Sequence, residues 1–264
     1  MAKHFGNCRI CGVVGPLTFE HVPPKSAGNE PYGIAFDVAH HMQNTVDSPI
    51  SEMRRRKLPR GSGGHYFCAR CNNWTGGMYG PAYAMWAHQG QRHRLALGDT
   101  NSIALPFRIF PLRVFKQILA IFGATCGERM FEVHPFLRKL VLDRDAHGMP
   151  DDLRLYCYIV HPYSRFSRHS GIVGIADIGS GKAHTLAEFA FRPFGYLLTF
   201  GSTPPPERGL FDLTFFSNHS FGDYRELHLP IPVRPVESYL PADFRSKAEW
   251  LSATGGYSVG SEPG

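Results

Sequence analysis

The chain lacks any uninterrupted run of about 18 apolar residues, the length that a membrane-spanning helix needs, and it shows no internal repeat. Its first residues, Met1–Phe5, lead directly into a cysteine pair, so the apolar region of a signal peptide has no room to form. With 264 residues, of which 43% are hydrophobic, the chain has ample material for a core. We therefore expect a folded cytoplasmic protein with no membrane partner.

Cysteine is scarce, and four of the six cysteines form two Cys-x-x-Cys pairs, Cys8–Cys11 and Cys68–Cys71. In a reducing compartment, such pairs favour a metal over disulfides. Each pair can fold into a tight turn that points both sulfur atoms at one ion, which is the arrangement of a structural zinc site. Cys126 and Cys157 stand alone in apolar surroundings, and we expect them to be inert core residues.

Acidic residues are few near the cysteine pairs. Residues 1–100 contain 11 Lys and Arg against 6 Asp and Glu, whereas residues 101–264 contain 17 against 16. The densest basic segment, residues 53–60, fits a run of phosphates, although a solvated charged surface is the alternative. Its five cations are Arg54, Arg55, Arg56, Lys57 and Arg60.

The two cysteine pairs bracket Glu20 and His21, and the second pair runs directly into Asn72. Glu20 and His21 belong to a short extended segment, residues 17–22, which Pro23 and Pro24 terminate. A zinc ion bound by both pairs would hold these two residues near Asn72, although the chain separates them widely. Asn72 has a second interpretation, as the N-cap of the helix that follows it.

The pattern of the first 95 residues predicts a zinc-stabilised module with a basic insertion at about 26–64. Residues 65–67 should form a second strand, and residues 72–94 should be largely helical. Because glycines interrupt the start of that segment, we expect its regular helix from about Ala82. Within the insertion, residues 34–42 or 50–58 are candidates for short helices.

Residues 96–264 should form an accessory α+β region that is rich in strands after about residue 151. Apolar spacing predicts core helices over 112–122 and 134–142, the second opening at Pro135. The fold class is thus α+β, with an antiparallel sheet following the helices. The predicted strands are 153–160, 171–178, 183–191, 194–200, 210–216 and 226–231.

Residues 5–90 resemble the HNH, or ββα-metal, endonuclease superfamily, particularly zinc-knuckle members such as phage endonuclease VII. The resemblance rests on the order of a knuckle, Glu20-His21-x-x-Pro24, and then Cys68-x-x-Cys71-Asn72. It implies a hairpin whose first strand carries an acid and a histidine, and a helix that carries a metal-binding Asn. It also implies that the four cysteines bind structural zinc and do not touch the substrate.

The resemblance assigns roles that suit phosphodiester hydrolysis. A neutral imidazole, with an ordinary pKa near 6.5, can accept the proton of the attacking water at cellular pH, so His21 is the expected general base. Glu20 and Asn72 offer oxygen ligands for catalytic Mg²⁺ or Mn²⁺. Lys25, Arg70 and the basic segment 53–60 are expected to contact nucleic acid.

One departure from the family pattern concerns the residue that orients the base. Members commonly carry a middle asparagine shortly before the second knuckle, but residues 61–67 contain none. We expect His65, Ser62 or a backbone carbonyl to orient His21 instead.

Three functions follow from these observations. The leading expectation is a metal-dependent endonuclease acting on DNA, with RNA as an alternative substrate, and by analogy a role against foreign DNA. The second is a zinc-stabilised nucleic-acid-binding protein without catalysis. The third is a nuclease controlled by a C-terminal region that binds a ligand, a protein partner or a second copy of the chain.

Overall fold

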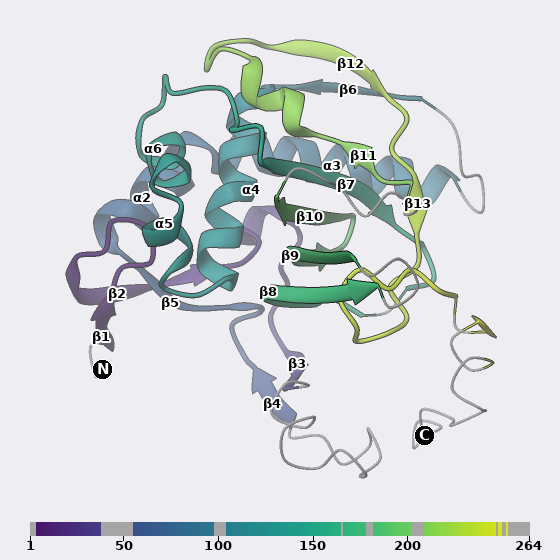
Figure 1. Ribbon diagram of the computed structural model, residues 1–264, viewed down its shortest axis with the longest axis horizontal. Helices are drawn as coiled ribbons and strands as arrows, with labels where there is room; N and C mark the ends of the chain where they lie inside the picture. The colour runs from purple at the N-terminus through teal and green to yellow at the C-terminus, as the bar shows by residue number, and fades with distance from the viewer. Residues whose placement is uncertain are drawn as a thin grey trace.

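The fold is α+β, as the sequence predicts, with antiparallel sheets and helices around a common core (Figure 1). The computed structural model describes residues 4–37, 55–97, 104–164, 166–177, 182–201, 209–246, 248, 249 and 252. Among the predicted phosphate-binding cations, Arg54 lies outside these residues.

A three-stranded antiparallel sheet in the order β1-β2-β5 carries the residues between the cysteine pairs. Its strands are β1 His4–Asn7, β2 Val14–His21 and β5 Gly63–Cys68. Both strands predicted here are confirmed, and both are longer than expected. In the β2–β5 pairing, Glu20 lies opposite Gly64 and His21 opposite Gly63, so the last two residues of β2 have glycines as their cross-strand neighbours.

The helix after the second knuckle begins earlier than the glycines suggest. Helix α2 covers Ala69–Met78 and α3 covers Gly80–Leu97, so the prediction of a regular helix from Ala82 is wrong. Tertiary contacts overcome the weak helix propensity of glycine. The indole of Trp74 and the hydroxyl of Tyr79 both donate to the Val141 carbonyl, at 3.0 and 2.7 Å.

The described part of the insertion is extended rather than helical. After the short 3-10 helix η1, Lys25–Ala27, come β3, Gly33–Phe36, and β4, Arg55–Leu58, which pair with each other in a separate two-stranded sheet. The predicted helices over 34–42 and 50–58 are therefore wrong where the structure describes these residues. Backbone pairing between distant segments is a contact that local propensity does not contain.

The rest of the chain follows the predicted helix-then-strand order. Helix α4, Pro111–Thr125, and helix α6, Pro135–Leu142, confirm both predicted core helices. The short helix α5 and the 3-10 helix η3 complete them, at Met130–Val133 and Thr214–Asn218. The remaining strands are β6 Leu105–Ile109, β7 Leu153–Val160, β8 Arg168–Asp177, β9 Lys182–Phe191, β10 Phe194–Phe200, β11 Phe211–Asp212, β12 Arg225–Leu229 and β13 Val233–Arg234.

One strand prediction fails in the C-terminal half, and a second predicted strand, 226–231, forms as β12 but pairs outside the large sheet. The segment 210–216 forms only β11 and then turns into η3. Strand β12 does not join the large sheet, whose path is β11-β7-β10-β9-β8 with β13 beside β7; it pairs instead with β6, which the sequence did not predict. Figure 1 shows β6 and β12 across the top of the molecule, away from the large sheet.

One hydrophobic core joins the two predicted regions, since its buried residues run from Cys8 to Val233. Helix α3 packs directly on the large sheet: the Trp86 ring stacks on Phe194 with centroids 4.3 Å apart, and its indole donates to the Tyr196 hydroxyl at 2.9 Å. Figure 1 places α4 between the β1-β2-β5 sheet and the large sheet. The predicted boundary between residues 95 and 96 falls inside α3, and core packing continues across it.

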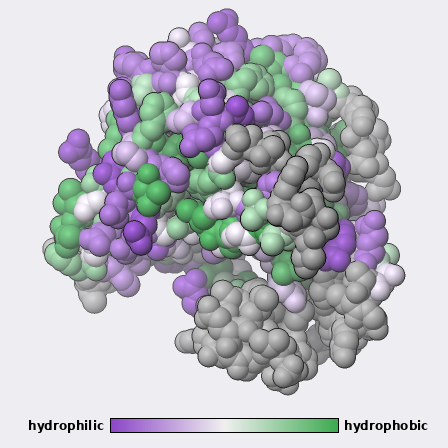
Figure 2. Space-filling view, viewed as in Figure 1, coloured by the Kyte–Doolittle hydropathy of each residue, from purple (hydrophilic) through white to green (hydrophobic). Residues whose placement is uncertain are grey.

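The described helices include none with the length and apolarity to cross a bilayer. Figure 2 shows hydrophilic residues along the upper rim, and a group of hydrophobic residues at the left edge, where Figure 1 places the β1–β2 hairpin. That hairpin region carries Phe5, Val13 and Val14, whose side chains are largely exposed.

Candidate functional site

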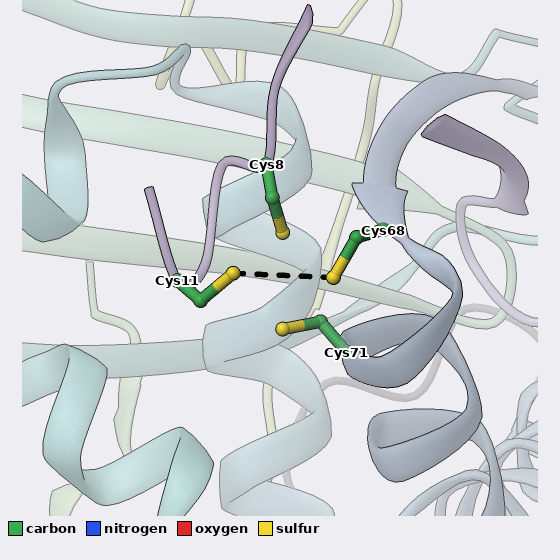
Figure 3. Close-up of side chains that lie close together, drawn as sticks. All are labelled: Cys8, Cys11, Cys68 and Cys71. Atoms are coloured by element: carbon green, nitrogen blue, oxygen red, sulfur yellow. Dashed lines mark hydrogen bonds between the residues drawn. The ribbon is translucent and has the colours of Figure 1, made fainter. Parts of the chain in front are cut away.

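The four paired cysteines meet at one point. Cys8 and Cys11 lie in the turn between β1 and β2, Cys68 ends β5, and Cys71 lies in the first turn of α2. Figure 3 shows their sulfur atoms pointing toward a common centre. All four Sγ atoms lie within 4.8 Å of one another, and those of Cys11 and Cys68 are 3.9 Å apart.

This geometry fits a tetrahedral zinc ion. Zinc–sulfur bonds of about 2.3 Å place the ligands of a regular tetrahedron ~3.8 Å apart. The site is also prepared electrostatically, because a hydrogen bond from the Cys71 thiol lowers the pKa of Cys8 to about 4. The same hydrogen bond and burial raise the pKa of Cys71. One thiolate is thus readily available, and a divalent cation would favour ionisation of the others.

Backbone hydrogen bonds shape the first knuckle before any metal is considered. The Gly12 amide donates to the Cys8 carbonyl at 2.8 Å. Gly12 has a φ of +76°, a backbone conformation that residues with a side chain rarely adopt. Arg9 ties the turn to the rest of the module: its amide donates to the Tyr66 carbonyl and its guanidinium donates to the Ala124 carbonyl. The cysteine cluster thereby joins β5, α2 and the end of α4.

Asn72 connects the helix to the strand that carries Glu20 and His21. Its side-chain amide donates to the Thr18 hydroxyl at 2.9 Å and to the Phe19 carbonyl at 3.2 Å. Because α2 starts at Ala69 with Cys68 as its N-cap, Asn72 lies inside the helix and does not cap it. The N-cap interpretation is wrong, and the Asn72 amide lies against the backbone immediately before Glu20.

Glu20 is a buried carboxyl group. Only 7% of the residue is exposed, and desolvation raises its pKa to about 7. Among the described residues, no hydrogen-bond donor or cation pairs with this carboxyl group. Burying a carboxylate without a partner is costly, so such a group marks a place where a cation would be stabilising. The chemistry of Glu20 and of the nearby Asn72 amide, both oxygen ligands, suits Mg²⁺ or Mn²⁺.

His21 is half-buried at the end of β2. Burial lowers its pKa below the ordinary 6.5, and the cationic side chains of Arg60 and Lys25 lower it further. The Arg60 backbone carbonyl acts in the opposite direction, as the acceptor of a hydrogen bond from the imidazole. A ring that donates from one nitrogen leaves the other nitrogen able to accept a proton. The group that orients His21 stays a prediction, and the Arg60 carbonyl is the candidate that its pKa favours.

His65 lies in a different environment from the one expected of an orienting residue. Its ring stacks on His4, with centroids 3.6 Å apart, and meets the edge of Phe19 at 5.5 Å. The described contacts of His65 are thus with aromatic rings rather than with the His21 imidazole. Arg60 affects His21 directly, because its positive charge lowers the His21 pKa. Its guanidinium lies 3.8 Å above the ring centroid of Phe19, the residue two positions before His21.

Asn29 is a buried residue of this site that the sequence analysis missed. Its side-chain amide donates to the Pro23 and Ser62 carbonyls, at 2.7 and 2.8 Å, and accepts from the Ser62 amide at 2.9 Å. It therefore fastens the end of β2 to the turn that presents the Arg60 carbonyl. The only signal in the sequence is its position in a turn-forming Gly-Asn dipeptide, which does not distinguish it from an ordinary loop residue.

The predicted phosphate-binding cations fall into three groups. Lys25 and Arg60 lie beside His21, close enough to affect its pKa. Arg55, Arg56 and Lys57 form strand β4, next to the site along the chain. Arg70 is separate: it precedes Asn72 by two residues, which places it on nearly the opposite side of α2, beside Trp74 and Leu142.

Comparisons of the chain with protein-family models, with curated proteins and with solved structures found no match. The tetracysteine cluster and its place between an antiparallel hairpin and a helix are therefore properties established from this chain alone.

Proposed function

We propose that the protein is a metal-dependent endonuclease that hydrolyses phosphodiester bonds in DNA. The observation that carries the proposal is the buried Glu20 carboxyl group, which has no partner among the described residues and lies between the Asn72 contact and His21. Glu20 and His21 are neighbours in β2, and Asn72 of α2 contacts Phe19, the residue before them. Metal-assisted hydrolysis requires such a combination of carboxylate, amide and neutral imidazole.

In this mechanism His21 is the general base. Its lowered pKa keeps the imidazole neutral near pH 7, and the Arg60 carbonyl holds the ring so that the free nitrogen can accept a proton from water. The water oxygen bonds to phosphorus as the bond to the 3′ oxygen breaks. Glu20 and Asn72 would hold the divalent cation, which when bound stabilises the negative charge on the phosphate and the leaving oxygen.

The surrounding charges support a polyanionic substrate. Lys25 and Arg60 both lie at the His21 end of β2. The Arg60 guanidinium lies over the Phe19 ring, and no acid in the described part of the chain pairs with it. A phosphate that approached His21 would meet both cations. The zinc cluster has a structural role in this proposal, because it connects the strand that carries the base to the helix that carries Asn72.

The test is cleavage of supercoiled and linear DNA by the purified protein with Mg²⁺, with Mn²⁺ and with EDTA. We expect cleavage with either metal and none with EDTA. His21→Ala should lower the rate by about 10²–10⁴-fold, the usual contribution of a positioned base. Asn72→Ala should raise the metal concentration needed for half-maximal activity, while zinc content stays at one per chain.

Two outcomes would overturn the proposal. Cleavage that His21→Ala leaves unchanged would remove the assigned base. DNA binding without cleavage in any metal would instead favour a zinc-stabilised nucleic-acid-binding protein. Arg225→Ala, which alters an exposed arginine of β12, is the matched control for general loss of positive charge.

A further inference from the structure

The described part of the insertion is a two-stranded ribbon, here called the β3–β4 ribbon, with two unlike faces. Directly paired residues of antiparallel strands point to the same face, and neighbours along a strand alternate. The pairs are Gly33 with Leu58, Ile34 with Lys57, Ala35 with Arg56, and Phe36 with Arg55. One face therefore carries Ile34, Phe36, Arg55 and Lys57, and the other carries Gly33, Ala35, Arg56 and Leu58.

The first face points away from the protein. Ile34 is 58% exposed and Phe36 is 43% exposed, and Arg55 and Lys57 are also exposed. The Arg55 guanidinium lies 5.8 Å from the Phe36 ring centroid. On the other face Ala35 and Leu58 are partly buried, whereas Gly33 and Arg56 are exposed. The charge of Arg56 lowers the pKa of His169 in β8, so this face is the one turned toward the large sheet. Large apolar groups exposed beside cations indicate a binding surface rather than a core.

The base of the ribbon is fastened to the candidate site. The Leu58 carbonyl accepts hydrogen bonds from the Tyr32 amide at 2.9 Å and the Gly61 amide at 3.1 Å, which closes the ribbon. Two residues after Leu58 comes Arg60, whose guanidinium lies over the ring of Phe19 in β2, 3.8 Å from its centroid. Asn29 then locks the same turn through Ser62. A substrate bound at His21 would therefore meet the ribbon at a defined position.

The charge and the size of the ribbon indicate which kind of molecule its outward face binds. Strands β3 and β4 contain three cations and no acidic residue, which suits a polyanion. Each strand has four residues and so spans about 13 Å. The major groove of B-DNA, about 12 Å wide, admits a two-stranded β-ribbon, whereas the minor groove, about 6 Å wide, does so only when the DNA is deformed. Figure 1 shows the ribbon projecting below β8, clear of the helices.

We propose that the outward face of the β3–β4 ribbon enters the major groove of duplex DNA beside the bond that is cut, and reads the sequence there. This inference rests on the proposed nuclease function. Ile34 and Phe36 are suited to contact thymine methyl groups, and Arg55 and Lys57 to bind guanine edges or the flanking phosphates. The ribbon thereby makes the enzyme specific for double strands and gives it a base preference near the cut.

The experiment uses the full chain and a duplex library with randomised bases around a fixed position, together with the same library as single strands. Cleavage rates and the sequences at the cut are measured for wild type, for Ile34→Ala/Phe36→Ala and for Lys57→Ala. Arg225→Ala is the control, because this exposed strand arginine lies in β12, at the opposite end of the molecule from the ribbon (Figure 1).

We expect the double variant to cut duplex DNA about tenfold more slowly and to lose the base preference of wild type. Lys57→Ala should reduce the slope of log binding constant against log salt by about 0.9, as the loss of one phosphate contact does. Rates on single strands should change less than about twofold in the double variant, and Arg225→Ala should match wild type on both libraries.

An active wild type whose ribbon variants keep their rate and base preference would overturn the inference and leave the nuclease proposal intact. Equal losses on single strands and duplexes would also overturn it, because they would indicate a general phosphate contact. Binding of duplex by the His21→Ala protein is measured in parallel. If wild type proves inactive, weaker duplex binding by the ribbon variants in that background still supports the ribbon, while the nuclease proposal fails.

Discussion

Two buried glutamates, one in each half of the molecule, show how differently the halves use a buried charge. Glu188 in β9 is fully buried, and its carboxylate accepts hydrogen bonds from the Tyr158 hydroxyl at 2.5 Å, the Arg168 guanidinium at 2.8 Å and the Ala242 amide at 2.7 Å. Glu20 in β2 is almost as buried and has no such partner among the described residues. A buried charge with hydrogen-bond partners holds a fold together, whereas a buried carboxylate without them makes the folded state less stable when it ionises.

The two halves also differ in what holds them. The large sheet is stabilised by aromatic packing on α3, where Gly90 lies so close to Phe194 that a Cβ would come within 2.2 Å of its ring. The β1-β2-β5 sheet is small, and the cysteine cluster connects its turn to α2. Removing each kind of support should therefore have separable effects.

The largest effect should come from the zinc cluster. Cys71→Ser, or removal of the metal by a chelator, should lower the zinc content below one per chain and lower the Tm by roughly 10 °C. Hydrogen exchange should accelerate in β1, β2 and β5 while β7, β9 and β10 remain protected. Cys126→Ser is the control outside the cluster. A chelated protein with unchanged protection in β2 would show that sulfur-bound metal does not support this sheet.

The next effect should come from breaking the satisfied glutamate. Glu188→Gln leaves the Arg168 guanidinium, which is 5% exposed, without its ion-pair partner. Loss of one member of a buried pair typically costs about 3–5 kcal/mol, so the free energy of unfolding in urea should fall by that amount. A loss below about 1 kcal/mol would mean that the network contributes little to stability.

Glu20→Gln should act in the opposite direction, and by less. Since the Glu20 pKa is raised to about 7 in the folded protein, its ionisation makes wild type less stable as the pH rises from about 4.5 through 7. At pH 8 without Mg²⁺ or Mn²⁺, the variant should therefore be about 1–2 kcal/mol more stable than wild type, and at pH 4 the difference should vanish.

Adding a divalent cation tests the same difference between Glu20 and Glu188. Mn²⁺ should raise the Tm of wild type and of Glu188→Gln at pH 8, because both keep Glu20, and should raise the Tm of Glu20→Gln much less. Equal responses of wild type and Glu20→Gln would show that Glu20 does not bind the cation. Differential scanning calorimetry of the three proteins, with and without Mn²⁺, makes the measurement.

The smallest predicted effect concerns the pKa of His21. Burial and the Arg60 guanidinium lower it. At a saturating concentration of Mg²⁺, which would hold Glu20 as the carboxylate, the acid limb of log kcat/KM against pH should therefore fall below pH 6.5. Arg60→Ala removes the charge and retains the backbone carbonyl, so the limb should move up by about half a pH unit. Arg70→Ala, on the other side of α2, should leave it in place. An acid limb at or above pH 6.5 in wild type would contradict this environment.

Much of this architecture was accessible from local patterns. Apolar spacing predicted α4 and α6, Pro135 marked the start of α6, and alternating runs predicted β7, β9 and β10 closely. The cysteine spacing predicted the cluster, because each Cys-x-x-Cys turn supplies two of the four sulfur ligands that one tetrahedral zinc ion needs. These features depend on contacts within a few residues, or on the need of one metal ion for four sulfur ligands.

Other features depend on pairing between distant segments, and local patterns did not contain them. Two segments of the insertion, 34–42 and 50–58, are candidates for short helices in the sequence, but their described residues pair as β3 and β4. Strand β12 pairs with β6 instead of the large sheet. Helix α2 begins at Ala69 despite Gly76 and Gly77, because Trp74 and Tyr79 are fastened to the Val141 carbonyl. In each case tertiary contacts outweighed intrinsic propensity.

The sequence by itself determined the donor atoms of this protein: four thiols, a carboxyl group, an amide and an imidazole, in an order that already indicated zinc and a nearby oxygen-rich site. Only the tertiary structure decided which of the described groups have partners, how Asn29 joins the Pro23 and Ser62 backbone next to the histidine, and which face of the β3–β4 ribbon points outward. The reason is physical, since side-chain chemistry belongs to the residue, whereas desolvation, hydrogen-bond satisfaction and facing depend on segments that meet only when the chain folds.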